Sequence, residues 1–225
     1  MKQTLLGVAI HDAGWVAHAH ARSWLKLPEV KIVSVSDISR ERARKLVAEL
    51  GLDCPARDSY AAVLRDKQVD IVDTCSPSHL HTEHAIAAAR VGKHVLVEKP
   101  MAVTTAEADA MLAAARRAGK QLQVGQVERV NPAGTAARSM VQRPMFIESH
   151  RLALFQPRSL DIDVVFDLMI HDIDLVLEFT GQAPEQLSAV GVAVLSQSED
   201  IANARLEFAD GCVANLTASR VSQDR

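Results

Sequence analysis

The sequence contains few cysteines and aromatic residues and has no strong excess of one charge. Of its 225 residues, 4% are aromatic and three are cysteines: Cys54, Cys75 and Cys212. An odd number of cysteines without CxxC spacing argues against a disulfide framework or a structural zinc site, and favours a reducing cytoplasm. A net charge of −3 lacks the basic excess of nucleic-acid binding proteins, and so few aromatics argue against a base-stacking surface.

The sequence also has no long apolar run. The N-terminal run, residues 5–10, is shorter than the roughly 7–15 residues of a signal-peptide core, so it predicts a buried strand. The apolar stretch 164–179 is interrupted by acidic residues and a histidine, which excludes a membrane span. With 48% hydrophobic and 24% charged residues, we expect a globular cytoplasmic protein with no membrane or nucleic-acid partner.

Up to Gly125, strand-like and helix-like segments alternate. The strand-like segments are residues 5–10, 30–36, 69–75, 94–97 and 122–125. The helix-like segments are residues 15–27, 39–50, 58–65, 79–90 and 104–118. This alternation predicts βαβ units in a doubly wound parallel sheet, and the continuous Val/Ile/Leu strands fit a sheet covered on both faces.

After Gly125 the pattern changes to strands that follow one another directly. Helices are expected from Asn131-Pro132 and over 163–179, and strands over 145–152, 187–195, 201–208 and 212–221. Ala209-Asp210-Gly211 is typical of a hairpin turn. We therefore expect an α/β chain with a doubly wound domain at 1–125 and an α+β domain with a mostly antiparallel sheet at 126–225.

The turn after the first strand partly matches the dinucleotide fingerprint G-x-G-x-x-G/A. Gly14 takes the second glycine position and Ala17 the third, while Asp12 stands in place of the first. Asp37 ends the second strand where an acid binds the adenosine ribose, which favours NAD over NADP, although Arg40 and Arg42 follow. The alternative is an ordinary strand that ends in a capping aspartate.

Two other loops lie at the carboxyl ends of strands, where open α/β sheets bind their ligands. One is Cys75-Ser76-Pro77-Ser78-His79-Leu80-His81, and the other is Val97-Glu98-Lys99-Pro100. The ammonium of Lys99 could hold a substrate hydroxyl and stabilise developing negative charge on its oxygen. The alternatives are a solvated loop lysine at 99 and a capping or surface histidine at 81.

Asp167, His171 and Asp174 are spaced i, i+4, i+7, so they share one face of a predicted helix. An imidazole can take a proton from an alcohol at neutral pH, and Asp167 could orient it or bind a neighbouring hydroxyl. There is no HExxH and no convincing third nitrogen ligand, so we expect no metal here. A solvated helix face is the remaining alternative.

Together these motifs resemble the glucose–fructose oxidoreductase/inositol dehydrogenase (Gfo/Idh/MocA) family. The resemblance lies in Glu98-Lys99-Pro100, in the Ser-Pro-x-x-x-His loop and in the D-x-x-x-H helix, and it spans the chain. It implies Lys99, His171 and Asp167 as catalytic residues and a Lys-Pro bond that is often cis. The cofactor contacts that it implies, with the turn described above, are Gly14, Trp15, Val16, Asp37, Ser76, Pro77, His81, Glu98 and Lys99.

Within that family, segments 124–132, 167–174 and 201–221 are most similar to UDP-N-acetylglucosamine 3-dehydrogenases of lipid A precursor synthesis. This similarity implies oxidation of the substrate 3-hydroxyl by NAD, with Asn131, Arg158 and Asp167 as substrate contacts. Arg129 and Arg151 could also meet the diphosphate. The alternatives are an inositol or simple-sugar dehydrogenase and a truncated, non-catalytic cofactor-binding protein.

Two departures from the family pattern bear on these expectations. Asp12 replaces the first glycine, and the chain stops at Arg225 where family members continue past 300 residues. The second domain is therefore expected to be short at its C-terminus, with a homo-oligomer expected only if that domain is complete.

Overall fold

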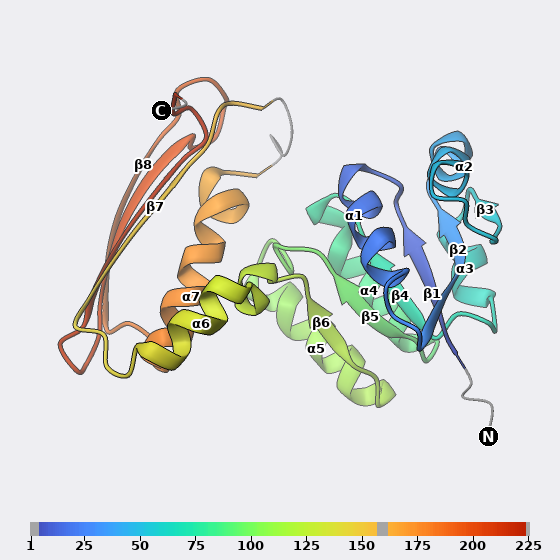
Figure 1. Cartoon of the computed structure of the whole chain (residues 1–225), viewed down its shortest axis with the longest axis horizontal. Helices are drawn as coiled ribbons and strands as arrows, with labels where there is room; N and C mark the ends of the chain where they lie inside the picture. The colour runs from blue at the N-terminus through green and yellow to red at the C-terminus, as the bar shows by residue number, and fades with distance from the viewer. Residues whose placement is uncertain (1–4, 157–161, 224–225) are drawn as a thin grey trace. The chain divides into compact units, whose positions relative to one another are not determined.

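The computed structural model describes residues 5–156 and 162–223. Contacts divide the chain into two compact units, Met1–Gly125 and Gln126–Arg225 (Figure 1). No helix among the described residues is long and apolar enough to cross a membrane.

The first unit is a six-stranded parallel sheet with helices on both faces, which confirms the predicted doubly wound fold. Its strands, in spatial order, are β3 (Ala56–Arg57), β2 (Val30–Ser36), β1 (Leu6–His11), β4 (Ile71–Thr74), β5 (His94–Val97) and β6 (Leu122–Val124). The helices are α1 (Trp15–Trp24), α2 (Arg40–Glu49), α3 (Tyr60–Arg65), the 3₁₀ turn η1 (Ser78–Leu80), α4 (His81–Arg90) and α5 (Thr105–Ala118). The strand order reverses between β1 and β4, which is the topological switch point where such sheets bind ligands.

Strand β1 shows why this sheet is covered on both sides. Successive side chains of a strand point to opposite faces, and here both faces are buried. Ile10 packs in one cluster with residues of α1 and α2, whereas Ala9 packs in the other with residues of α3, α4 and α5. Helix α5 begins at a capping box formed by Thr104 and Glu107.

The second unit contains a four-stranded sheet in the order β7-β10-β9-β8. The strands are β7 (Phe146–Leu152), β8 (Gln186–Val192), β9 (Ile201–Glu207) and β10 (Val213–Ser219). Only β7 and β10 pair in parallel, so the expected mostly antiparallel sheet is confirmed. The other elements are η2 (Val127–Val130), α6 (Pro132–Met140), the π-helical turn Val165–Met169 (η3) and α7 (Ile170–Thr180).

One face of this second sheet carries the core of the unit. Val164, Met169 and Val176 pack against alternate residues of β9 and β10, including Leu206 and Leu216. The burial of β9 alternates along the strand, as expected when one face of a sheet is covered and the other is not.

Several boundaries differ from the sequence predictions. The first helix ends at Trp24 rather than Leu27, and the predicted helix 163–179 consists of a π-helical turn followed by α7. Strand β3 was not predicted, because two residues are too few to show a periodic pattern. Nothing in the sequence separates a π-helical turn from the α-helix that continues it.

Candidate functional site

The turn that joins β1 to α1 is open to a ligand. Asp12 adopts the left-handed conformation (φ 70°) that the first glycine of the fingerprint would adopt, and its N–H donates to the carbonyl of Ser36 at 2.8 Å. Gly14 precedes α1 with no side-chain cap on the helix. A Cβ built on Gly14 would meet no atom within 4 Å. Uncapped N–H groups at an open helix N-terminus fit a pyrophosphate.

The Asp37 carboxylate lies beneath this turn and is buried. It accepts hydrogen bonds from the N–H of Ala13 (2.9 Å) and of Ser39 (2.7 Å), and it pairs with Arg42 at 2.9 Å. Burial alone would raise its pKa, but these donors hold the pKa below the usual value of an aspartate. Asp37 is therefore a charged group that already has protein partners.

The pKa of Asp12 is shifted in the opposite direction to that of Asp37. Burial disfavours the charged form of Asp12, and the neighbouring negative charge of Asp37 adds to that effect, so the pKa of Asp12 is raised to about 6. Arg42 offsets only part of this shift. Of the two acids, Asp12 is the one that keeps a proton to higher pH.

A buried polar network that the sequence analysis missed lies at the same edge of the sheet. His20 of α1 places Nδ1 2.9 Å from Asp73 of β4, and Nε2 2.9 Å from Glu98, which follows β5. The indole N–H of Trp24 donates to Asp73 at 2.6 Å. Burial would lower the pKa of His20, but its hydrogen bonds, chiefly to Asp73, raise that pKa to about 12.

The same network contains the one group of metal-ligand atoms that gather within 4.8 Å among the described residues: His20, Asp73 and Cys75. Both ring nitrogens of His20 already face carboxylates. The protonated imidazole accounts for this arrangement without a metal ion.

The two strand-end loops are joined by His81. Its side chain is buried, with Nδ1 2.8 Å from the carbonyl oxygen of Pro100 and Nε2 2.8 Å from that of Ser76. The motif implied a direct cofactor contact, but the structure instead places His81 between the backbones of the two loops. The hydroxyl of Ser76 lies 3.0 Å from Nδ1 of His84, and the Lys99–Pro100 bond is cis.

The remaining expected cofactor residues lie around these loops. Trp15 is 79% exposed at the start of α1, Val16 is half-buried beside it, and Pro77 is exposed. At the end of β4, the hydroxyl oxygen of Thr74 is buried and has no hydrogen-bond partner among the described residues. An open helix N-terminus and an orphaned hydroxyl at the switch point fit a dinucleotide cofactor.

In the second unit, Asp167 and His171 lie where the π-helical turn passes into α7. Asp167 is buried at 6% exposure and His171 is half-buried. The turn is held at its start by Asp163, whose side chain accepts a hydrogen bond from the N–H of Phe166 at 2.9 Å. Such π turns are rare and often occur at functional sites.

The other acids of α7 are taken up by ion pairs within the same unit. Arg129 contacts both carboxylate oxygens of Asp174, and Arg151 contacts both oxygens of Asp172. Arg151 also pairs with Glu128 at 3.3 Å. The expected meeting of Arg129 and Arg151 with a diphosphate is therefore not supported, because carboxylates already occupy both guanidinium groups.

Asn131, a further expected substrate contact, lies at the start of α6. Asn131 caps α6: its side-chain oxygen accepts from the N–H of Ala133 at 3.0 Å and its amide donates to Glu128 at 2.8 Å. This local role explains the Asn-Pro start of the helix. Arg158 lies outside the described residues.

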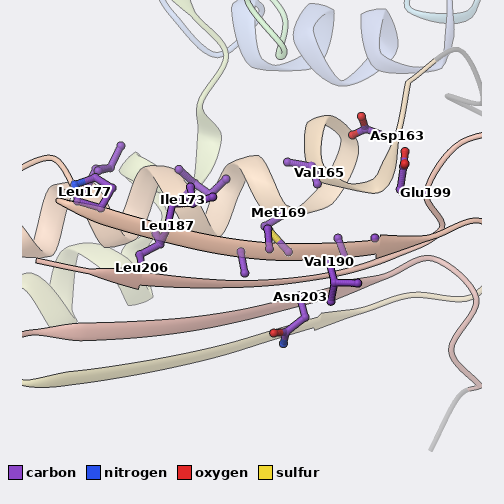
Figure 2. A pocket seen from close by; sticks show the side chains of 15 residues that line it. Asp163, Val165, Met169, Ile173, Leu177, Leu187, Val190, Glu199, Asn203 and Leu206 are labelled. Carbon is purple, nitrogen blue, oxygen red and sulfur yellow. The ribbon is translucent and has the colours of Figure 1, made fainter.

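A cavity of about 490 Å³ lies between α7 and strands β8 and β9 (Figure 2). Met169, Ile173 and Leu177 line it from the helix side, and Leu187 and Leu206 line it from the sheet. Met169 and His171 are two residues apart, so they point to different sides of the helix. The apolar cavity is therefore part of the packing between helix and sheet, and Asp167 and His171 do not line it.

Two family models match the chain. Residues 6–126 match the oxidoreductase family with an NAD-binding Rossmann fold, and residues 135–225 match the Gfo/Idh/MocA C-terminal domain. The two matches correspond to the two units of the structure.

Individual relatives agree with these matches. A UDP-N-acetylglucosamine 3-dehydrogenase from Acidithiobacillus ferrooxidans is 39% identical over all of this chain, which covers 68% of that protein. A solved structure of that dehydrogenase superposes with a TM-score of 0.90 at 38% identity, over 98% of this chain and 71% of that one. A myo-inositol 2-dehydrogenase from Thermotoga maritima is 25% identical over 95% of this chain and 68% of its own length. The chain belongs to the Gfo/Idh/MocA family of NAD-binding oxidoreductases.

Proposed function

We propose that the protein is an NAD-dependent dehydrogenase that oxidises a secondary hydroxyl of a sugar, namely the 3-hydroxyl of UDP-N-acetylglucosamine. The observation that carries this proposal is the 39% identity to a UDP-N-acetylglucosamine 3-dehydrogenase, which extends over the whole chain. Identity confined to the Rossmann unit would support only cofactor binding. Here it includes the second unit, which contains Asp167 and His171.

The cofactor is proposed to be NAD rather than NADP. The open turn at Gly14 would hold the pyrophosphate, and Asp37, at the end of β2, stands at the position where an acid binds the adenosine ribose in this fold. Negative charge there disfavours a 2′-phosphate, and Arg42, the nearby cation, is already paired with Asp37. When bound, NAD supplies the nicotinamide carbon that accepts the hydride.

Residues of the chain bind the substrate hydroxyl and accept its proton. The ammonium of Lys99 holds the hydroxyl oxygen and stabilises the negative charge that develops on it. A ring nitrogen of His171 takes the hydroxyl proton, and Asp167 orients that ring or binds a neighbouring hydroxyl. Glu98 and the loop at Ser76 lie at the carboxyl edge of the sheet, where they would border the cofactor.

A turnover assay with NAD tests this proposal. NADH formation is followed with UDP-N-acetylglucosamine, myo-inositol and free N-acetylglucosamine as substrates. We expect the unaltered protein to oxidise the nucleotide sugar. In Lys99→Ala and in His171→Ala we expect the turnover rate to fall by a factor on the order of 10² or more. A matched control is His150→Ala, because His150 is exposed on β7 and its side chain pairs with the exposed residue Glu148 at 3.2 Å.

Each outcome assigns the protein to one class. Turnover of myo-inositol alone would mean that the substrate is a cyclic polyol and not a nucleotide sugar, which agrees with the 25% identity to a myo-inositol 2-dehydrogenase. Calorimetric NAD binding without turnover of any substrate would make the protein a non-catalytic cofactor binder. Full activity of both alanine variants would refute the assigned catalytic pair.

A further inference from the structure

We infer that His20 is a positioning residue for the proposed reaction: its ring bridges Asp73 and Glu98 and so fixes the strand-end turn that carries Lys99. The inference rests on the proposed function, in which Lys99 holds the substrate hydroxyl. His20 would act through Glu98 and would not contact the substrate itself.

The bridge joins three elements of the first unit. His20 comes from α1, Asp73 from β4 and Glu98 from the end of β5, and their side chains are 14%, 0% and 13% exposed. Each ring nitrogen lies 2.9 Å from a carboxylate oxygen. Ionised carboxylates only accept hydrogen bonds, so both nitrogens must carry hydrogen and the ring must be an imidazolium. One positive charge thus lies between two negative charges with little access to water.

Glu98 passes this restraint on to Lys99. Its Oε1 faces His20, and its Oε2 accepts the backbone N–H of Lys99 at 3.1 Å. On a third side lies Gly125, where an added Cβ would come within 2.5 Å of Oε1. The carboxylate is therefore confined by a charged donor, by a backbone donor and by a glycine that leaves just enough room for it.

The charge on Glu98 supports this arrangement. Burial would raise the pKa of Glu98, but the hydrogen bond and charge of His20 and the N–H of Lys99 hold that pKa below its usual value. Asp73, the anchor on the other side, is fixed in turn by the indole N–H of Trp24 at 2.6 Å. Without the imidazolium, two acids would face each other across a buried gap, and Glu98 would no longer be drawn toward α1.

The test compares His20→Gln, Glu98→Gln and the double variant with the unaltered protein. Glutamine is neutral and polar, so it removes the charge without leaving an apolar cavity. Removing one member of a buried ion pair is strongly destabilising, and the double variant removes both charges of the His20–Glu98 pair, which keeps the test valid if a single variant folds poorly. The matched control is His94→Gln, because His94 lies at the opposite end of the strand that leads to Glu98.

We expect His20→Gln to lower kcat on the order of 10- to 100-fold, as a small misplacement of a catalytic group does, with KM and the calorimetric Kd for NAD within about twofold. The double variant should be no slower than the slower single variant, because both changes break the same link. His94→Gln should match the unaltered protein. Loss of the buried ion pair lowers Tm whatever the role of His20, so the NAD affinity and KM are the readouts that separate the two roles. A purely structural role would weaken NAD binding and raise KM together with the fall in kcat, and that result would overturn the inference, as would an unchanged kcat in His20→Gln or additive losses in the double variant.

Ring nitrogen NMR of His20 separates failure of this inference from failure of the proposed function. If no sugar is oxidised, the proposed function fails, and with it the catalytic part of the inference. The NMR measurement still tests whether the bridge exists. The bridge is supported if the His20 ring is doubly protonated at pH 9 in the unaltered protein and is no longer so in Glu98→Gln. A ring in the unaltered protein that is neutral at pH 9 overturns it.

Discussion

Replacing Asp12 by asparagine should strengthen cofactor binding and remove a pH dependence from the stability of the protein. Asp12 occupies the position of the first glycine of the turn at φ 70°, a conformation that asparagine tolerates about as well as aspartate. Asp12→Asn therefore changes the charge and leaves the backbone requirement almost untouched. The pKa of Asp12 is raised to about 6 by burial and by the charge of Asp37, so at pH 8 the turn carries two ionised acids.

The size of the effect follows from the shift in pKa. A rise from 3.8 to about 6 corresponds to roughly 3 kcal/mol, and solvent screening of a half-buried group reduces this to about 1–2 kcal/mol. Because the folded state binds the Asp12 proton more tightly than the unfolded state, this contribution is favourable below about pH 4. It is lost as the pH rises through about 6. Asp12→Asn should thus be about 1–2 kcal/mol more stable than the unaltered protein at pH 8, with almost no difference at pH 4.

Urea unfolding at pH 4.5, 6 and 8 measures the stability difference, and calorimetry with NAD at pH 6 and 8 measures the affinity. Removing a negative charge beside the pyrophosphate site should tighten NAD binding at pH 8 about fivefold, which corresponds to about 1 kcal/mol. Asp53→Asn is the matched control, because Asp53 is fully exposed and its ion pair with the exposed residue Lys31 is long, at 3.7 Å. A stability difference that stays constant from pH 4.5 to 8, or weaker NAD binding by Asp12→Asn at pH 8, would refute the reasoning.

Three further changes test interactions that stabilise each unit from within. Arg220→Met leaves the buried carboxylate of Asp200 without the cation 2.8 Å away, and should lower the free energy of unfolding by about 3 kcal/mol in urea; a loss below about 1 kcal/mol would contradict the buried pair. Gly7→Ala would place a Cβ 1.7 Å from the backbone carbonyl of Gln68, so circular dichroism should show a large fall in Tm, and an unchanged Tm would disprove the close approach. Thr104→Ala removes the cap of α5 and should destabilise the protein by about 1 kcal/mol, and no change in the urea midpoint would count against the capping box.

The overall fold could be read from the sequence because its signals are local and repeated. Alternating strands and helices leave few topologies once crossovers are right-handed, so the parallel sheet follows from the pattern. Gly119 and Gly181 follow the predicted helical segments 104–118 and 163–179, as glycine commonly does where a helix ends, and both adopt the left-handed conformation after α5 and α7. The π-helical turn before α7 has no such signal, since its residues suit an α-helix equally well.

The polar network around His20 could not be read in the same way. Its partners Asp73 and Glu98 are 53 and 78 residues away along the chain, and only the folded sheet brings them together. In sequence, His20 is one of several histidines near a turn that already matched a fingerprint. The same limit applies to His81, whose motif predicted a ligand contact, whereas the fold buries it between two carbonyl groups.

The acids at the start of α7 have different roles in the structure, although the sequence motif places them together. The spacing of Asp167, His171 and Asp174 predicted a single face presented to a substrate. Arg129 binds Asp174 through both carboxylate oxygens, and Arg151 does the same with Asp172, so these two acids tie α7 to η2 and β7 within the unit. A substrate diphosphate that recruited either arginine would have to break a bidentate pair and leave an aspartate without its cation, and for the buried Asp172 that is a strongly unfavourable exchange. The ion pairs are therefore best explained as supports that hold the helix in place, while the proposed chemistry remains with Asp167 and His171.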